Sequence, residues 1–292
     1  MSKSKRTISG RTVVITGAAS GIGRALAQRL SAHGCAVAIA DVDENGLKET
    51  DASLNGNTLV RVLDVRDAEA QRDFAAEVRE WAPTPIGAVF NNAGVAVAAT
   101  VLHGAPEDDT WLWDINFHGV VNGTRAFLPI LVEQDEGVIV NTSSVYGLLA
   151  VPVQSAYSAS KFAVRGFTDS LRHELRGTGV AAITVHPGGI RTNIVHNARF
   201  REGSDGIGMD REQMAQNFAA VAMTEPAKAA EKIHRGVEKG KARILIGPDA
   251  YLLDTVARVA PANGFEWISK FGNVLGKASG KLSQVRNRAH AD

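Results

Sequence analysis

Short, strongly apolar runs alternate with segments of helical composition over the first 190 residues of this 292-residue chain. That alternation is typical of a parallel sheet covered by helices, because strands that are buried on both faces are apolar along their whole length. We therefore expect an α/β fold with a doubly wound parallel sheet of about seven strands and helices on both faces. The expected strands are Thr12–Thr16, Ala36–Ala40, Leu59–Leu63, Ala88–Phe90, Val138–Asn141, Ala181–Val185 and Arg243–Ile246.

The segments between the strands predict helices and one long loop. Helices are expected near Ile22–His33 and over Ala68–Trp81, Glu107–Phe117 and Ser155–Arg176. Residues 190–225 are polar and glycine-containing, which indicates a substrate lid loop with a short helix near Gln213–Val221. No linker rich in Pro or Ser divides the chain, so we expect one domain over residues 1–247 and a helical C-terminal extension over residues 248–292.

Charge and composition exclude several classes of function. The chain has 32 Lys and Arg against 31 Asp and Glu, and this balance argues against a nucleic-acid binder that works through a uniform basic field. No apolar run approaches the roughly 18 residues of a membrane span, and the first residues do not resemble a signal peptide. Cys35 is the single cysteine, and the eight histidines form no metal-binding pattern. We expect a cytoplasmic protein with a small-molecule partner and no metal.

A glycine-rich turn separates the first expected strand from the first expected helix. It has the sequence Thr-Gly-Ala-Ala-Ser-Gly-Ile-Gly over residues 16–23. Glycines permit positive φ and let the backbone approach a pyrophosphate, and the helix N-terminus offers free N–H groups. Its G-x-x-x-G-x-G spacing differs from the G-x-G-x-x-G fingerprint, so alone it is weak evidence for a dinucleotide.

The second expected strand is followed at once by an acidic residue, Asp41, 18 residues past Gly23. A carboxylate there can accept hydrogen bonds from both hydroxyls of an adenosine ribose and would repel a 2′-phosphate. Val42, rather than a basic residue, comes next. NAD is therefore favoured over NADP, although Asp41 could also be a helix N-terminal acid beside Asp43 and Glu44.

Tyr157 and Lys161 are four residues apart in an expected helix and therefore share one face. An ammonium group beside a phenol favours the phenolate, which would lower a pKa that starts near ~10 and allow proton exchange with an alcohol. This spacing is commonplace on helix surfaces. The hydroxyl-rich segment Asn-Thr-Ser-Ser over residues 141–144 ends an expected strand just upstream, so hydroxyl, phenol and ammonium groups can converge.

Taken together, these motifs resemble the short-chain dehydrogenase/reductase (SDR) family of the classical type. The resemblance covers about residues 8–247 in the family's order and spacing. The segments that carry it are TGAASGIG (16–23), Asp41, Asp64-Val65, NNAG (91–94), Asn116, NTSS (141–144), YSASK (157–161) and PGGIRT (187–192).

The resemblance implies a Rossmann-type fold and a role for each motif residue. Tyr157 would be the acid/base, Ser144 rather than Ser143 would hold the substrate oxygen, Lys161 would bind the nicotinamide ribose and lower the pKa of Tyr157, and Asn116 would hold a water of the proton relay. Asp64 and Val65 would contact the adenine, and residues 187–192 would hold the nicotinamide carboxamide. The full expected cofactor set is Gly17, Ser20, Gly21, Ile22, Gly23, Asp41, Asp64, Val65, Asn91, Ala93, Gly94, Tyr157, Lys161, Pro187, Gly188, Ile190 and Thr192.

The sequence is compatible with several alternative roles for the C-terminal extension. One apolar stripe is formed by Leu252, Leu253, Val256 and Val259, and a second by Trp267, Ile268, Phe271, Val274 and Leu275. The end is basic, with Lys270, Lys277, Lys281, Arg286 and Arg288. A packed appendage is the favoured interpretation; a subunit contact, a cover for the substrate pocket and a weak contact with an anionic membrane are the alternatives.

The leading functional hypothesis is an NAD-dependent oxidoreductase that interconverts a secondary alcohol and a ketone. An NADPH-dependent carbonyl reductase and a non-catalytic NAD-binding protein of the same fold are the alternatives. The resemblance also implies a homodimer or homotetramer. Apolar residues after Ser144 favour an apolar alcohol or ketone as substrate, namely Val145, Leu148, Leu149, Val151 and Val153.

Overall fold

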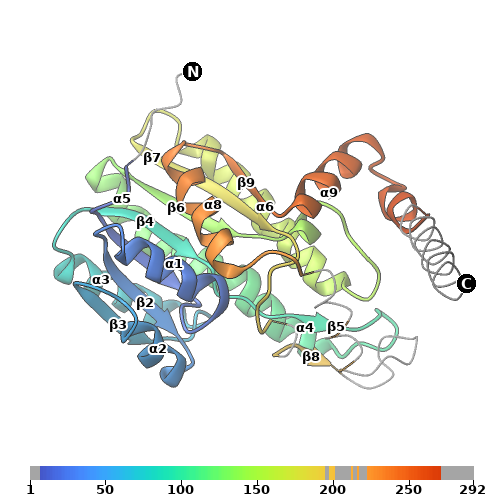
Figure 1. Ribbon diagram of the computed structural model, residues 1–292, viewed down its shortest axis with the longest axis horizontal. Coiled ribbons are helices and arrows are strands. Elements are labelled where there is room, and N and C mark those ends of the chain that lie inside the picture. Colours follow the sequence, from blue (N-terminus) through green and yellow to red (C-terminus); the bar gives the residue numbers. More distant parts are fainter. Residues whose placement is uncertain (1–6, 195–196, 201–211, 213–215, 217–221, 271–292) are drawn as a thin grey trace, which may run out of the picture.

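A single parallel sheet organises the protein, as shown by a computed structural model that describes residues 7–194, 197–200, 212, 216 and 222–270 (Figure 1). The sheet has seven strands in the order β3-β2-β1-β4-β6-β7-β9, and every neighbouring pair is parallel. This confirms the expected α/β fold with a doubly wound sheet. The strands are β1 (Thr12–Thr16), β2 (Ala36–Asp41), β3 (Thr58–Val62), β4 (Ile86–Asn91), β6 (Gly137–Thr142), β7 (Val180–Pro187) and β9 (Arg243–Ile246).

Alternate residues of the strands β1, β2, β4, β6 and β7 face two separate apolar cores. In β1, Val13 and Ile15 face the core beneath α1 (Gly21–Ser31) and α8 (Pro226–Glu238), which lie side by side in Figure 1. Val14 faces the opposite core. That second core packs against α3 (Ala68–Trp81), α5 (Gly119–Gln134) and α6 (Ser155–Glu174). Burial on both faces explains why the strands are apolar throughout.

Three helices were not anticipated from the sequence, namely α2 (Glu44–Asp51), α5 and α8. In α5, glycines and a proline lower the helix propensity, yet the glycines are needed for close packing. A methyl group on Gly119 would lie 2.7 Å from Val65 Cγ2, and one on Gly123 would lie 2.3 Å from Asn91 Oδ1. Tertiary packing therefore overrides local propensity here.

The helix expected over Glu107–Phe117 is divided. It is observed as α4 (Pro106–Trp113) and continues through one turn of π-helix, η1 (Asp114–His118), directly into α5. Such single π turns occur frequently at functional sites because they redirect one side chain. Asn116 lies inside this turn.

The motif residues converge because of the strand order. β1, β4, β6 and β7 are adjacent, and the turns that follow their carboxyl ends lie at one edge of the sheet. Chain order reverses between β1 and β4, so this edge contains the switch point at which open α/β sheets bind ligands. The expected site residues therefore belong to neighbouring turns.

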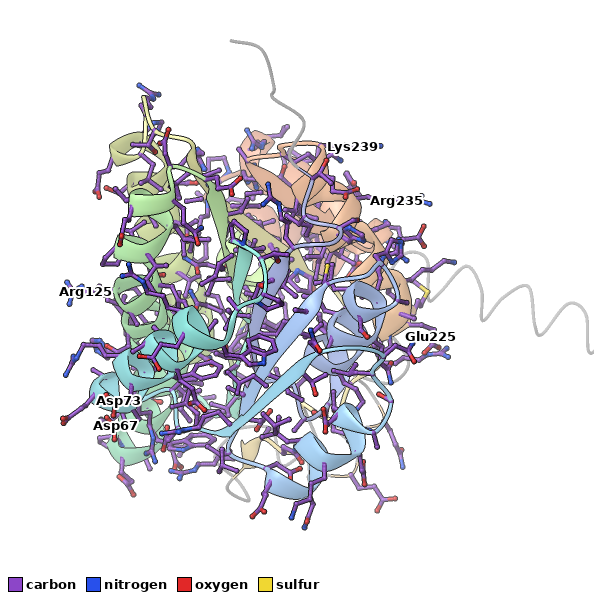
Figure 2. All side chains as sticks on the ribbon, turned by 90° about the vertical axis from the view of Figure 1, so that its left-hand side faces the viewer. Asp67, Asp73, Arg125, Glu225, Arg235 and Lys239 are labelled. Atoms are coloured by element: carbon purple, nitrogen blue, oxygen red, sulfur yellow. The ribbon has the colours of Figure 1, made fainter. Side chains whose placement is uncertain are left out.

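The chain beyond β9 forms α9 (Pro248–Val259), and residues 264–270 are again helical. Phe271, Val274 and Leu275 of the second apolar stripe lie outside the described residues. Figure 2 shows charged side chains such as Arg125 and Arg235 at the periphery, where both residues are exposed. Within the described part of the chain, no helix is both long enough and apolar enough to cross a membrane.

Candidate active site

The glycine turn after β1 is shaped by contacts that only glycine permits. Gly17 and Gly21 have φ of 68° and 54°, in the left-handed region. A methyl group on Gly23 would lie 2.0 Å from the Gly17 carbonyl oxygen, and one on Gly17 would lie 2.7 Å from Ala93 Cα. The α1 N-terminus that follows has neither a side-chain cap at Ser20 nor an acidic residue in its first turn. Its free N–H groups and positive dipole end fit an anion such as a pyrophosphate.

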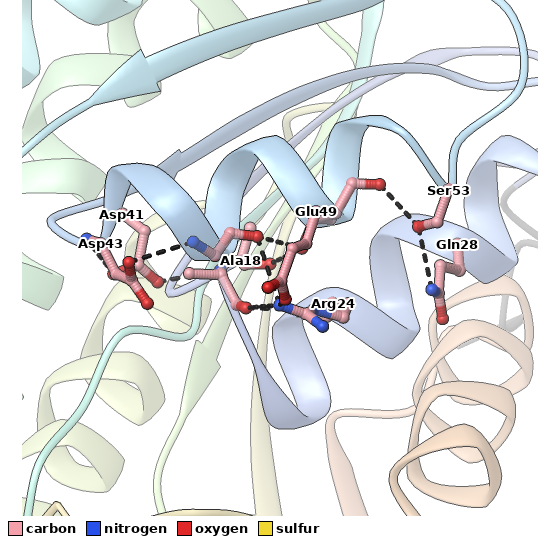
Figure 3. A network of polar contacts seen from close by, with 10 residues as sticks. Ala18, Arg24, Gln28, Asp41, Asp43, Glu49 and Ser53 are labelled. Atoms are coloured by element: carbon pink, nitrogen blue, oxygen red, sulfur yellow. Dashed lines mark hydrogen bonds and ion pairs between the residues drawn. The ribbon is translucent and has the colours of Figure 1, made fainter.

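Asp41 faces this turn from the end of β2 (Figure 3). Its Oδ2 accepts the Ala19 N–H at 3.0 Å and its Oδ1 accepts the Asp43 N–H at 3.2 Å. Asp41 therefore helps to hold the turn, in addition to any role toward a ribose. The guanidinium of Arg24 is bound to the Ala19 carbonyl and to Glu49 Oε2, at 2.9 Å from the latter. This basic side chain near the turn is thus already paired with a carboxylate.

The expected adenine contacts lie at the end of β3. Asp64 receives hydrogen bonds from the Arg66 guanidinium at 2.6 and 2.9 Å, and this partner lowers the pKa of the Asp64 carboxyl. Val65 is buried against Gly119 of α5. Asp64 is therefore a fixed anion at the rim of the site.

The turn after β4 is tied to the glycine turn by a residue that the sequence analysis did not single out. Asn92 Nδ2 donates to the Thr16 and Gly17 carbonyl oxygens at 3.2 and 3.3 Å, and its backbone N–H donates to Thr16 Oγ1 at 3.1 Å. The neighbouring Asn91 points elsewhere: its amide donates to Asn141 Oδ1 at 2.8 Å and to Thr124 Oγ1 at 3.2 Å. Asn91 thus links β4 with β6 and α5.

Asn116 is fully buried in the π turn, where its side chain closes a ring with the backbone of Val95. Its Oδ1 accepts the Val95 N–H at 2.9 Å and its Nδ2 donates to the Val95 carbonyl at 3.0 Å. A methyl group on Gly94 would lie 3.2 Å from Asn116 Oδ1 and 3.3 Å from Lys161 Nζ. Gly94 therefore lies directly beside Asn116 and Lys161, and any side chain at this position would crowd both groups.

The two serines after β6 have different partners. Ser143 Oγ donates to the Lys161 backbone carbonyl at 2.7 Å, so that hydroxyl is committed to fixing α6. Ser144 Oγ accepts the Tyr146 N–H at 3.2 Å, and Ser144 also hydrogen-bonds to Tyr157. The Ser144 proton is therefore not committed to a backbone carbonyl, in contrast to the Ser143 proton.

The phenol of Tyr157 and the ammonium group of Lys161 lie together on α6, with Lys161 Nζ 5.6 Å from the Tyr157 ring centroid. Burial raises the pKa of Tyr157 to about 12, and the hydrogen bond from Ser144 acts in the opposite direction. Burial also lowers the pKa of Lys161 to about 8, while its Nζ donates to the Thr142 carbonyl at 3.2 Å. Desolvation is the largest cause of the shift at Tyr157, so the net pKa of Tyr157 is raised in the protein alone, and the effect of Lys161 on that pKa stays a prediction.

The loop after β7, residues 187–192, reaches the glycine turn. We call it the β7 loop. A methyl group on Gly21 would lie 3.1 Å from Thr192 Cγ2. Ile190 is buried in the same core as α1, and Ile22 packs against that core. The structure thus brings the β7 loop, the glycine turn and the β4 turn around one region at the carboxyl ends of the strands.

A buried histidine forms a hydrogen bond with the backbone of Ser144. His186 in β7 is fully buried, and its Nδ1 hydrogen-bonds to the Ser144 carbonyl oxygen at 3.0 Å, whereas its Nε2 has no hydrogen-bond partner among the described residues. Burial lowers the pKa of His186 to about 4; of the charges around it, Arg243 and Arg165 act in the same direction and Asp254 opposes them. His186 is therefore neutral near pH 7 and donates through Nδ1.

Replacing His186 should flatten the pH dependence of stability. Folded His186 is protonated only below about pH 4, whereas an unfolded histidine takes up a proton below ~6.5. The contribution of the neutral, buried His186 to the free energy of unfolding is therefore complete above pH ~6.5. It is lost as the pH falls toward 4, by up to about 3 kcal/mol. Between pH 7 and pH 5, the free energy of unfolding of His186→Asn should fall by about 2 kcal/mol less than that of the wild type.

Urea unfolding at both pH values measures this difference, with the exposed His103→Asn as control. The control should keep the pH dependence of the wild type. Equal losses in His186→Asn and the wild type would contradict the burial of a neutral imidazole at this position.

Two segments beyond the turns after β4 and β7 meet in a small sheet. β5 (Val97–Ala98) pairs in parallel with β8 (Arg199–Phe200), so part of the expected lid contacts the turn after β4. Arg199 forms an ion pair with the buried Asp108 at 2.9 Å and stacks on Trp111, with Cζ 3.8 Å from the ring centroid. Apart from Gln216, the expected helix near Gln213–Val221 lies outside the described residues.

The apolar residues expected around the substrate differ in exposure. Val145, Leu148 and Leu149 are buried, whereas Val151 and Val153 are partly exposed. Val153 has a φ of 66°, which is unusual for a β-branched residue and costs on the order of 1–3 kcal/mol. Its carbonyl accepts the Ala99 N–H at 3.1 Å, which helps to hold this strained turn two residues before α6.

Comparison with known proteins gives consistent matches. A family model described as short chain dehydrogenase matches residues 11–203. The SadH protein of Mycobacterium tuberculosis, named as an oxidoreductase, is 43% identical over 256 residues, which are 86% of this chain and 91% of SadH. A short chain dehydrogenase/reductase of Burkholderia phymatum in complex with NAD has a TM-score of 0.76 at 26% identity and covers 88% of this chain and 95% of its own. A serine dehydrogenase with NADP+ has a TM-score of 0.69 at 28% identity, over 80% and 93% of the two chains.

Proposed function

Because the chain belongs to the short-chain dehydrogenase/reductase family, we propose that it is an NAD-dependent oxidoreductase that interconverts a secondary alcohol and a ketone. The observation that carries this proposal is the arrangement of Ser144, Tyr157 and Lys161: Tyr157 is hydrogen-bonded to Ser144 and lies beside Lys161. Lys161 in turn adjoins Gly94 of the β4 turn, which contacts the glycine turn before the uncapped N-terminus of α1. The glycine cradle and the free N–H groups of α1 fit the pyrophosphate of a dinucleotide, and the proton donors lie at the same edge of the sheet.

In the direction of ketone reduction, the side chains stabilise charge that develops on the substrate oxygen. Tyr157 holds its proton at neutral pH, since burial raises its pKa to about 12, and it donates that proton to the oxygen. Ser144 donates a hydrogen bond to the same oxygen. In the reverse direction, Tyr157 accepts the alcohol proton. A nicotinamide held at this site would supply the hydride chemistry, and next to its oxidised form the phenolate of Tyr157 would be favoured.

The remaining residues position the cofactor in this proposal. Lys161 would hold the nicotinamide ribose, Asn116 would hold a water of the proton relay, and the β7 loop would bind the carboxamide through its backbone. Asp41 would accept hydrogen bonds from the adenosine ribose, and Asp64 with Val65 would contact the adenine. A panel of apolar secondary alcohols with NAD, followed at the NADH absorbance, tests the activity and the substrate class together.

Replacing Asp41 should weaken the preference for NAD over NADP. A carboxylate that accepts ribose hydroxyls contributes about 1.5–3 kcal/mol and repels a 2′-phosphate, so Asp41→Ala should shift the ratio of the two dissociation constants at least about tenfold toward NADP. Calorimetric titration with NAD and NADP measures both constants. Asp43→Asn, which keeps the cap on α2, is the matched control and should leave the ratio unchanged.

An unchanged ratio in Asp41→Ala would remove the basis for NAD preference. Tighter binding of NADP than of NAD by the wild type would favour the alternative, an NADPH-dependent carbonyl reductase. Binding of either cofactor without turnover of any alcohol or ketone would favour a non-catalytic cofactor-binding protein.

A further inference from the structure

The β7 loop is held by the first turn of α9, which belongs to the C-terminal extension. The Gly189 N–H donates to Asp249 Oδ2 at 2.7 Å. A methyl group on Gly188 would lie 2.1 Å from Asp249 Oδ2 and 2.3 Å from Oδ1, so the carboxylate lies directly against the α-carbon of Gly188. A methyl group on Gly247 would lie 2.2 Å from Oδ1. One side chain therefore joins the turn after β9 to the loop after β7.

The groups on either side of this contact are themselves anchored. Arg243 of β9 forms an ion pair with Asp254 of α9 at 2.6 Å, and Ala250 is fully buried, so the first turns of α9 are fixed to the sheet. On the other side of the loop, the Thr224 N–H donates to the Gly189 carbonyl at 3.1 Å. The carboxylate of Asp249 thus acts from a rigid element on a loop that contains two consecutive glycines.

Asp249 also lies near Tyr146, an aromatic neighbour of Tyr157. Burial raises the pKa of Tyr146, and the negative charge of Asp249 raises it further. The ring of Tyr146 packs edge-on against Tyr157, with centroids 6.1 Å apart. Asp249 therefore contacts the β7 loop directly and is separated from Tyr157 by Tyr146.

We propose that Asp249 is a positioning residue that fixes the β7 loop in the conformation that binds the nicotinamide end of the cofactor. In this proposal, the extension beyond residue 247 contributes a residue that the active site needs, and is not only packed on the outside of the domain. This inference rests on the proposed function, in which the β7 loop holds the nicotinamide carboxamide. A loop with consecutive glycines loses much conformational freedom when it binds a ligand, and a carboxylate that already holds its backbone reduces that loss.

The test compares NADH with ADP-ribose, which shares everything except the nicotinamide. Asp249→Ala should raise the dissociation constant for NADH about tenfold, because a charge-assisted hydrogen bond to the loop is lost. The constant for ADP-ribose should stay within about twofold, because the glycine turn and Asp41 are untouched. Asp249→Asn keeps an acceptor oxygen for the Gly189 N–H and should bind NADH more tightly than Asp249→Ala. Thr255→Ala, exposed on the same helix, is the matched control and should behave as the wild type.

Hydrogen exchange without any ligand gives an independent readout, and the Gly189 amide should exchange at least about tenfold faster in Asp249→Ala. Equal weakening of NADH and ADP-ribose binding, or no change in either, would overturn the role of Asp249 toward the nicotinamide end. Unchanged exchange at Gly189 would overturn the contact itself. If the wild type bound neither compound, the proposed function would fail, and this outcome is distinguishable because it appears before any substitution is made.

Discussion

Replacing Tyr157 by phenylalanine should lower kcat about a thousandfold while leaving the binding of NADH within about threefold of the wild type. The substitution removes one oxygen and keeps the ring that packs against Tyr146. The proton donor for the substrate oxygen is lost, and Ser144 alone supplies a hydrogen bond without transferring a proton. Steady-state turnover of the best secondary alcohol, together with fluorescence titration of NADH, measures both quantities.

The exposed Tyr251→Phe is the matched control, because it removes the same oxygen from α9. It should turn over at the rate of the wild type. Normal turnover by Tyr157→Phe with a substrate that the wild type uses would show that another group carries the proton.

Replacing Gly23 by alanine should abolish measurable NADH binding, with a dissociation constant at least about a hundredfold higher than that of the wild type. The added methyl group would lie 2.0 Å from the Gly17 carbonyl oxygen, a backbone atom that cannot rotate away. The turn must therefore open, which displaces the N–H groups of the α1 N-terminus from the pyrophosphate. Loss of two charge-assisted hydrogen bonds, at about 1.5–3 kcal/mol each, accounts for a change of this size.

Gly166→Ala is the matched control, because Gly166 is in the helical interior of α6 and a methyl group there would have no heavy atom within 4 Å. It should bind NADH normally and gain about 0.5–1 kcal/mol of stability from the higher helix propensity of alanine. Thermal unfolding of both variants separates binding from folding. NADH binding by Gly23→Ala within threefold of the wild type would contradict the assignment of the turn as the pyrophosphate cradle.

The pattern of apolar and polar residues along the sequence was sufficient to predict the strands of the sheet and the order of the motifs between them. Strands such as Val138–Asn141 differ from the observed β6 only at their ends, since apolar runs buried on both faces are easily recognised. The helices α2 and α5 were missed for different reasons. α2 is a short helix whose first turn is capped by Asp43, and α5 carries glycines that are needed to approach Val65 and Asn91. The need for those glycines exists only in the folded protein.

The sequence indicated which residues gather at the candidate site, but not which contacts they form there. The sequence placed Tyr157 and Lys161 on one face, yet the rise in the pKa of Tyr157 depends on desolvation, which spacing does not reveal. His186 and Asp249 are distant in sequence from Ser144 and Gly189, the residues they hold. Only the strand order, with β9 beside β7, brings Asp249 to the β7 loop.

The proposed reaction requires that a hydride pass between a carbinol carbon and the nicotinamide at this site. It is tested most directly with a secondary alcohol of the panel that carries deuterium at its carbinol carbon, by mass spectrometry of the reduced cofactor. We expect one deuterium in the NADH formed by the wild type and no labelled NADH above background with Tyr157→Phe. Turnover that leaves the deuterium in the organic product, or labelled NADH formed equally well by Tyr157→Phe, would contradict it.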